Sequence, residues 1–283
     1  MPPLDRLSPL LERFRVRSGL FHSGPLCGTN VFPASGGHGF LHVLRRGEME
    51  VTHRRADGST ERERITRPSL LFFPRPLDHT FLNAPTDESD FACATLDFDG
   101  GATHPLVRTL PSSIVLPLDE VETLGPALDL LFAEVDNVRC GRPLLADRMF
   151  EVVLIQLLRW MLDHSGELDL PPGLIPGLAD ERLAPALVAL HEAPGEPWNL
   201  DALARTATMS RSAFAARFKE VLGRSPGDYL TEWRLTVAQE HLRAGMSVSA
   251  VAADLGYASA SAFSRVFAQR IGHSPRAWLA LAA

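Results

Sequence analysis

The fold of this chain is decided by residues 200–275, where one pattern occurs twice: LDALARTATMSRSAFAARFKEVLGRSP at 200–226 and VSAVAADLGYASASAFSRVFAQRIGHSP at 248–275. The copies are offset by 48 residues at Leu203 and Val251, and by 49 residues at Phe214 and Phe263. The second copy therefore has one more residue in its middle. A repeat of this period indicates that one supersecondary unit is present twice.

Each copy predicts two short helices joined by a turn. In its first part, apolar residues recur at i, i+3, i+4 and i+7, which forms one face of a helix. Serine accepts a hydrogen bond at a helix N-cap, and glycine ends helices because it adopts a left-handed conformation easily. The predicted N-caps are Ser210 and Ser259, and the predicted helix ends are Gly223 and Gly272. The turns are predicted at Met209–Ser210 in the first copy and at Gly256 in the second.

A helix-turn-helix unit reads DNA by laying its second helix in the major groove. The side chains expected to face outward from the two second helices are small or polar. They are Arg211, Ser212, Ala215, Ala216 and Lys219 in the first, and Ala260, Ser261, Ser264, Arg265 and Ala268 in the second. The first helix has fewer long polar side chains, so we expect it to read bases less strongly. The alternative is a helical bundle without a ligand, which two matched copies make less favoured.

Composition and charge narrow the class of protein. The 283 residues suffice for two domains, no apolar run reaches a membrane span, and no signal-peptide pattern begins the chain, so we expect a cytoplasmic protein. Three cysteines do not make a disulfide framework. The net charge is −6, but residues 195–283 hold ten Lys and Arg against seven Asp and Glu. The modest basic excess thus falls on the segment expected to meet phosphates.

Residues from about 185 to 283 resemble the DNA-binding domain of the AraC/XylS transcriptional regulators. The resemblance lies in Leu-Gly-Tyr at 255–257, in Phe263 and Phe267 four residues apart, and in Gly-x-Ser-Pro at 272–275. It implies two helix-turn-helix units joined by a long helix, here 228–243. It also implies double-stranded promoter DNA as a partner, and RNA polymerase as a second partner if the protein is an activator.

The first half of the chain predicts short strands followed by two helices. Strands are expected at 39–45, 48–54, 60–65, 69–73, 80–83 and 91–98, which suggests a barrel or sandwich. An amphipathic helix is expected within 4–14, and longer helices at 120–138 and 142–164. The expected fold is α+β, divided into a cupin-like sensor domain (1–118), a helical dimerisation segment (119–167), a linker (168–178) and the double helix-turn-helix domain (179–283).

The strand-rich region resembles the small cupin barrels found as sensor domains in one branch of this family. The match lies in Gly39-x-x-His42 with Gly47, and in Phe73-Pro74-x-x-x-x-His79-x-x-x-Asn83. Cupins commonly bind a metal ion through histidines of these two motifs. The first motif departs from the usual pattern, because His42 has no second histidine two positions away.

Two cysteines extend this candidate site. Similar regulators, including those that respond to reactive chlorine, have cysteines at the places of Cys27 and Cys93 and histidines at those of His42 and His79. The resemblance implies a tetrahedral zinc site, or an oxidisable switch at the two thiols. The alternatives are that both cysteines and His79 are core residues, or that the barrel binds an organic effector. Cys140 is expected to be structural.

These features favour a DNA-binding transcription regulator that is not an enzyme. The competing interpretation is a metal-dependent cupin enzyme, against which the sequence offers no second carboxylate–histidine group. The third interpretation is an adaptor protein that neither binds DNA nor has enzymatic activity. The apolar helix at 142–164 predicts a homodimer joined through the 120–164 helices, although burial of this helix within its own subunit is the alternative.

Overall fold

The computed structural model describes residues 4–54, 58–83, 89–137, 139–168 and 170–282. The chain divides into two compact units. One is Phe14–Pro171. The other combines Met1–Arg13 with Pro172–Ala283. The chain therefore leaves the helical unit after Arg13 and returns to it at Pro172.

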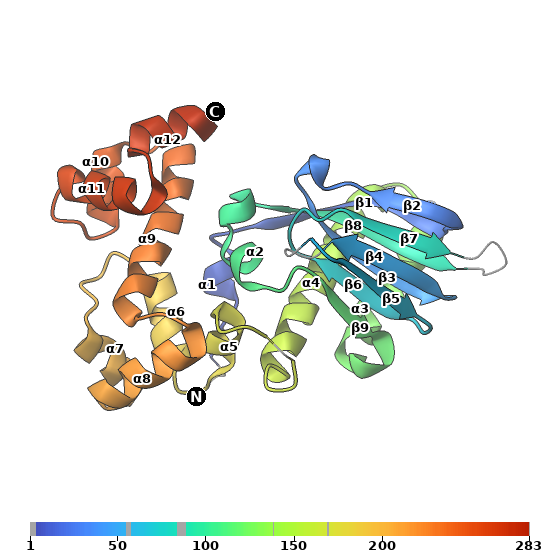
Figure 1. Cartoon of the computed structure of the whole chain (residues 1–283), viewed down its shortest axis with the longest axis horizontal. Coiled ribbons are helices and arrows are strands. Elements are labelled where there is room, and N and C mark those ends of the chain that lie inside the picture. The colour runs from blue at the N-terminus through green and yellow to red at the C-terminus, as the bar shows by residue number, and fades with distance from the viewer. Residues whose placement is uncertain (1–3, 55–57, 84–88, 138, 169, 283) are drawn as a thin grey trace. The chain divides into compact units, whose positions relative to one another are not determined.

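The first unit is built on two antiparallel sheets with the strand orders β1-β8-β3-β6-β9 and β2-β7-β4-β5 (Figure 1). The strands are β1 (Val16–Pro25), β2 (Gly28–Phe32), β3 (Gly39–Arg46), β4 (Met49–Arg54), β5 (Thr60–Ile65), β6 (Ser69–Phe73), β7 (His79–Asn83), β8 (Asp90–Phe98) and β9 (Ile114–Pro117). Every predicted strand is present to within one residue at each end. The sequence reading did not identify β1, β2 and β9.

Alternating side chains from both sheets meet in one apolar core. It includes Phe40 and Leu44 from β3, Phe73 from β6, and Phe81 from β7, all less than 9% exposed. Strands β3 and β6 are buried on both faces, which matches their nearly continuous apolar sequences. The predicted cupin-like barrel is thus confirmed as the architecture of this unit.

The first unit also contains helices. They are α2 (Pro105–Thr109), α3 (Gly125–Asp136) and α4 (Arg142–Asp163), and short 3-10 helices lie at Ala34–Gly36, Gly101–Thr103, Leu118–Glu120 and Glu122–Leu124. Helix α3 begins later than predicted because the last two of these short helices occupy its expected first turns. Helix α4 packs on β1, where the Asp147 carboxylate accepts a 2.7 Å hydrogen bond from the Leu20 backbone N–H.

That hydrogen bond lies beside a β-bulge. The pairing of β1 with β8 shifts register between Leu20 and His22, so Phe21 is the extra residue. Bulges redirect side chains and leave backbone groups without a ladder partner. Asp147 satisfies one such group and thereby fixes the bulged part of β1 to α4.

The second unit is helical. Its helices are α1 (Ser8–Leu11), α5 (Leu174–Ala179), α6 (Ala184–Glu192), α7 (Leu200–Thr206), α8 (Arg211–Leu222), α9 (Pro226–Arg243), α10 (Val248–Asp254), α11 (Ala260–Ile271) and α12 (Pro275–Ala282). Helix α9 runs between the pair α7–α8 and the pair α10–α11 (Figure 1). Both predicted helix-turn-helix units and the long helix that joins them are confirmed. The expected linker, 168–178, includes most of α5, whose apolar side chains are buried.

The start of the chain packs against this helical unit. Leu7 and Leu10 are 7% and 0% exposed, and the Arg6 guanidinium donates to the Leu178 carbonyl at 3.1 Å. The expected 1–118 cupin segment therefore has its first residues in the other unit. Their predicted amphipathic helix is only one turn long, since α1 ends at Leu11.

Local chemistry at the repeat agrees with the prediction. Ser210 and Ser259 accept from the backbone N–H groups of Ala213 and Ala262 at 3.3 and 3.1 Å. Gly223 and Gly272 end α8 and α11 with φ of 74° and 88°. The turn of the first copy has its left-handed residue at Thr208, with φ 52°, where the second copy has Gly256 with φ 70°.

Two glycines let the turn of the second copy approach the loop before the first copy. A Cβ atom on Gly256 would lie 2.1 Å from the Gly195 carbonyl oxygen, so the turn of the second copy touches the loop between α6 and α7 directly. Arg234 of α9 donates to the Pro194 and Glu196 carbonyls of that loop at 2.7 and 2.9 Å. Its guanidinium also lies 5.7 Å from the Tyr257 ring centroid. These contacts tie the turn of the second helix-turn-helix unit to the loop that leads into the first.

We predict that Gly256→Ala destabilises the helical unit by about 1–3 kcal/mol more than Gly245→Ala does. Both glycines have positive φ, but a Cβ on Gly245 meets nothing within 4 Å. The matched pair separates the clash from the cost of the left-handed backbone. Urea unfolding monitored by tryptophan fluorescence measures the free energy of unfolding of both variants. Equal losses of stability in the two variants would show that the loop adjusts to the added Cβ without cost.

Candidate functional site

The rotation of α8 about its axis is fixed by buried side chains. Phe214, Phe218 and Leu222 are at most 1% exposed and face inward. At 100° per residue, the row opposite them is Ser212, Ala216 and Glu220, all of which are exposed. The outward face of α8 is therefore an i, i+4, i+8 row.

Most residues predicted to face outward from α8 do so. Arg211, Ser212, Ala216 and Lys219 are exposed, but Ala215 is only half-exposed because it follows Phe214 toward the inner face. The sequence reading missed Ala213, Arg217 and Glu220. Their angular distance from the two phenylalanines would have identified them. Arg211 pairs with Asp201 of α7 at 3.6 Å, whereas Lys219 has no ion-pair partner among the described residues.

Helix α11 presents the equivalent row. Phe263 and Phe267 are fully buried, and the opposite row is Ser261, Arg265 and Gln269, all exposed. Ala260 and Ser264, also predicted to face outward, are half-buried. Gln269 was missed. Within the described chain, the Arg265 guanidinium pairs with no carboxylate, so it is available to a ligand.

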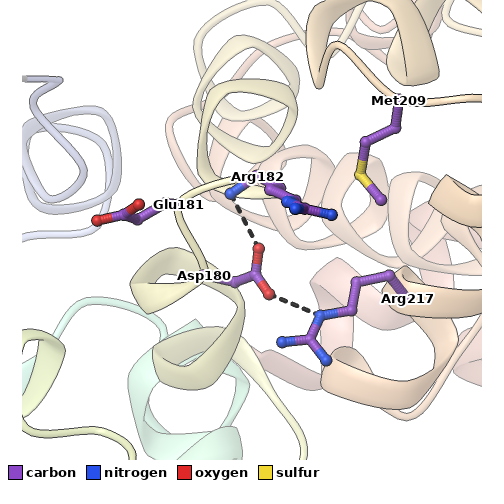
Figure 2. Close-up of a pocket in the computed structure, with 5 residues that line it drawn as sticks. All are labelled: Asp180, Glu181, Arg182, Met209 and Arg217. Atoms are coloured by element: carbon purple, nitrogen blue, oxygen red, sulfur yellow. Dashed lines mark hydrogen bonds and ion pairs between the residues drawn. The ribbon is translucent and has the colours of Figure 1, made fainter.

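A carboxylate holds α8 against the start of α6. Asp180 is partly buried, with a side chain 9% exposed, and it accepts from the Arg182 and Leu183 backbone N–H groups at 3.0 and 2.9 Å. Its other oxygen accepts from Arg217 Nε at 2.8 Å. Figure 2 shows this pair at the edge of a pocket of about 500 Å³ that Glu181 and Met209 also line. Asp180 thus joins the turn before α6 to the recognition helix.

The barrel interior brings together two of the predicted ligands. The Nε2 atoms of His42 on β3 and His79 on β7 are 2.9 Å apart, and both side chains are buried. His79 Nδ1 lies 2.8 Å from the Leu77 carbonyl oxygen. A carbonyl only accepts, so this nitrogen carries the proton of a neutral His79, and His42 Nε2 donates to His79 Nε2. The remaining nitrogen, His42 Nδ1, is buried without a hydrogen-bond partner among the described residues.

Burial keeps both imidazoles neutral. It lowers the pKa of His79 to about 4, although the bond to Leu77 opposes this effect. It also lowers the pKa of His42 well below its usual value, and the neighbouring His79 adds to the decrease. Aromatic rings surround the pair: Phe73 and Phe32 stack on His79 with ring centroids 4.0 and 4.9 Å away.

Phe21, the bulge residue of β1, lies over this cluster. Its ring centroid is 6.0 Å from that of His42 and 6.2 Å from that of Phe40. The side chain is nevertheless 45% exposed, unlike the fully enclosed rings below it. Phe21 therefore contacts the histidine cluster while part of it stays open to solvent.

The cysteines do not complete this cluster. Cys93 on β8 is paired in register with His42, and it is fully buried, which raises the pKa of its thiol. Cys27 is exposed and precedes Gly28, at the end of β2 opposite to the Phe32–His79 pair. Five residues of strand separate these positions by roughly 16 Å. Cys140 is exposed as well, so a structural role for its side chain has no support in burial.

The predicted four-ligand set is therefore not assembled. Among the residues the structure describes, no three or more His, Cys, Asp or Glu side chains are grouped so as to hold a metal ion. His42 and His79 come together, Cys93 lies in the adjacent register position, and Cys27 is separate. In this arrangement the donors do not fit a closed zinc site, which needs four ligands around one point.

Comparison with known proteins defines the family. A family model described as "Cupin" matches residues 5–163, and one described as "Helix-turn-helix domain" matches residues 203–280. An uncharacterized HTH-type transcriptional regulator of Haemophilus influenzae is 34% identical over 262 residues, which cover 84% of this chain and 85% of that protein. The chain belongs to the AraC family of transcription regulators.

Other members of the AraC family match with different coverage. The RCS-specific HTH-type transcriptional activator RclR of Escherichia coli is 27% identical over 246 residues, covering 84% of this chain and 85% of RclR. A putative AraC-like regulator of Streptomyces lividans is 35% identical, but this chain spans only 59% of its length. The DNA-binding domain of AdpA, solved with its target DNA, is 33% identical over 35% of this chain and 91% of that domain, with a TM-score of 0.34. No helix in the described residues is long and apolar enough to cross a membrane.

We predict that Asp180→Ala destabilises this AraC-type helical unit by about 1–2 kcal/mol, mainly through loss of the two backbone hydrogen bonds. Asp180→Asn keeps an acceptor for those bonds and loses only the charge pair with Arg217. That guanidinium is 45% exposed, so the cost of Asp180→Asn should stay below about 1 kcal/mol. Thermal unfolding of both variants tests this order, and the reverse order would make the ion pair the larger contribution.

Proposed function

We propose that this protein is a sequence-specific regulator of transcription that binds double-stranded promoter DNA, and that it is not an enzyme. The observation that supports this function most directly is the pair of exposed helix faces, on α8 and α11, each the second helix of a helix-turn-helix unit. The turn of the second unit at Gly256 meets the loop before the first unit at Gly195, and Arg234 of α9 donates to the same loop. RNA polymerase is the expected second partner if the protein activates transcription.

The two cations on these faces should act differently. Selection from a library of random duplexes yields a DNA sequence that the protein prefers. On that duplex, Arg265→Ala should weaken binding by about 1–3 kcal/mol and relax the preference at one base pair, as expected of a guanidinium that reads a guanine. Lys219→Ala should weaken binding to all sequences alike and reduce the slope of log K against log salt by about 1, because it removes a phosphate contact.

Arg64→Ala is the control for both variants. Arg64 is an exposed arginine on β5, paired with Glu48 at 2.8 Å in the barrel unit. It should leave the affinity and the salt slope unchanged. Wild-type affinity in both the Arg265 and Lys219 variants would contradict this use of α8 and α11.

We propose further that the protein is a homodimer joined through α4. One face of α4 is buried in its own subunit, but the opposite face exposes Leu145, Val152 and Ile155 at 43%, 42% and 36%. Together with Arg148 and Arg159, these residues form a series along α4 in which the spacing alternates between three and four residues. This is the spacing of a coiled-coil seam. Leu130 of α3 and Leu144 add exposed apolar surface. A second copy is the occupant that such a self-complementary seam fits.

The dimer is tested by placing charges in the seam. Val152→Glu combined with Ile155→Glu should shift the protein from dimer to monomer in sedimentation at tens of micromolar, because burying two carboxylates without partners is costly. The matched control is Val31→Glu on β2, an exposed valine (65%) outside the seam. A wild-type protein that is monomeric with and without DNA would exclude the dimer.

We propose that the barrel is the unit that receives the signal and that the His42–His79 pair is its centre. Two neutral imidazoles in an apolar interior, one with a buried atom left unpaired, cost stability and call for a functional reason. Zinc bound with cysteines, thiol oxidation and an organic effector are the possible signals. Of the two cysteines, the exposed Cys27 is the one that an oxidant meets first, since burial keeps Cys93 protonated.

Metal content and promoter output distinguish these signals. Zinc bound by the wild type and lost in His79→Ala and Cys27→Ser would support the four-ligand site and would require β2 to move toward the pair. A response to hypochlorite that is lost in Cys27→Ser but kept in Cys140→Ser, the other exposed thiol, would support oxidation. If Cys27→Ser and Cys93→Ser together change neither metal content nor oxidant response, the barrel binds an organic effector.

A further inference from the structure

The two recognition helices, α8 and α11, correspond residue by residue but differ in the chemistry of their exposed side chains. Each is twelve residues long, begins after a serine cap, ends at a left-handed glycine and buries two phenylalanines four residues apart. With the offset of 49 residues, the exposed row Ser212, Ala216, Glu220 of α8 therefore corresponds to the exposed row Ser261, Arg265, Gln269 of α11. Each row is about 12 Å long, which is the rise of three to four base pairs.

The row on α11 carries hydrogen-bonding groups suited to purines. A guanidinium binds guanine O6 and N7, and a glutamine amide binds adenine N6 and N7, each through two hydrogen bonds in the major groove. Arg265 and Gln269 are one helical turn apart, so they are neighbours on the helix surface. Neither side chain is engaged in an ion pair or hydrogen bond within the described chain, so both are available to bases.

The row on α8 carries the opposite chemistry. Ala216 stands where α11 has Arg265 and offers no hydrogen bond. Glu220 stands where α11 has Gln269 and can only accept. Among the bases it therefore suits the N4 amino group of cytosine best, because adenine presents the N7 acceptor beside its N6 amino group. Its carboxylate pairs with Arg217 at 3.2 Å, and Arg217 also pairs with Asp180 at 2.8 Å. Glu220 is thus kept in place at the face that should approach a polyanion.

We propose that base reading is divided unequally between the two helices, with Gln269 and Glu220 as specificity-determining residues. Helix α11 reads two neighbouring purines, a guanine through Arg265 and an adenine through Gln269. Helix α8 contributes position through phosphate contacts and rejects every base except cytosine opposite Glu220. This inference rests on the proposed DNA-binding function and assigns the bases that each half of the site requires.

The experiment is selection of duplexes from a random library, followed by affinity measurements with every single base substitution in the selected duplex. For the wild type, substitutions within the half met by α11 should cost more than those within the half met by α8. Gln269→Ala should abolish the adenine preference at one position, a loss of about 5- to 100-fold in discrimination. Gln269→Glu should convert that preference to cytosine, because it gives α11 the side chain that Glu220 provides at the corresponding position of α8.

The reciprocal change tests Glu220. Glu220→Gln should raise affinity for all duplexes, because a negative charge near phosphates is removed, and should change the preference at its position from cytosine to adenine. Arg270→Ala is the control on α11, since Arg270 lies beside the row and pairs with Asp228 at 2.7 Å. It should leave every base preference intact.

The outcomes separate this inference from the proposed function. If the wild type enriches no sequence, DNA binding itself is excluded. If it enriches a sequence but Gln269→Ala and Glu220→Gln leave all base preferences unchanged, the protein is a DNA-binding regulator and the division of reading proposed here is overturned. A preference that changes as stated in both variants supports it.

Discussion

Each half of the DNA-binding unit depends on the burial of two phenylalanines one helical turn apart. Phe214 and Phe218 have ring centroids 5.4 Å apart, and Phe263 and Phe267 are 5.5 Å apart. Burying such a side chain contributes about 1.5–3 kcal/mol, so the pairs fix the rotation of α8 and α11 far more firmly than any exposed contact. That rotation alone decides which side chains face outward. The chemistry of the outer face can therefore vary between the copies while the inner face stays the same.

The helix-turn-helix units were predictable because their determinants are local. Serine caps, glycine ends and the four-residue phenylalanine spacing all act within one or two turns, and the structure has each of them where the sequence indicates. The exposed rows were predicted less well. The predicted set includes Ala215, which is only half-exposed, and lacks Glu220 and Gln269, whose outward position follows from their angle to the buried phenylalanines.

The barrel shows what local patterns cannot supply. Strands were recognisable from apolar alternation, and the meeting of His42 with His79 agrees with the motifs that contain them. The position of Cys27 depends instead on the register of β2 on β7, and the position of Phe21 depends on a bulge between β1 and β8. These pairings join segments about fifty and seventy residues apart in the sequence. A shift of a few residues in the β2 register would alter the candidate metal site without changing any motif.

The course of the chain through the two units has a mechanical consequence. The barrel unit is an insertion in the helical unit, because the chain leaves the helical unit after Arg13 and returns to it at Pro172. A body attached by one linker can turn about any axis, whereas a body attached at two points turns freely only about the line through them. The residues on both sides of the insertion belong to the helical unit, including the buried Leu7 and Leu10. The helical unit is thus joined to the barrel at two covalent junctions, and the first of them follows directly on the segment whose Leu7 and Leu10 are buried.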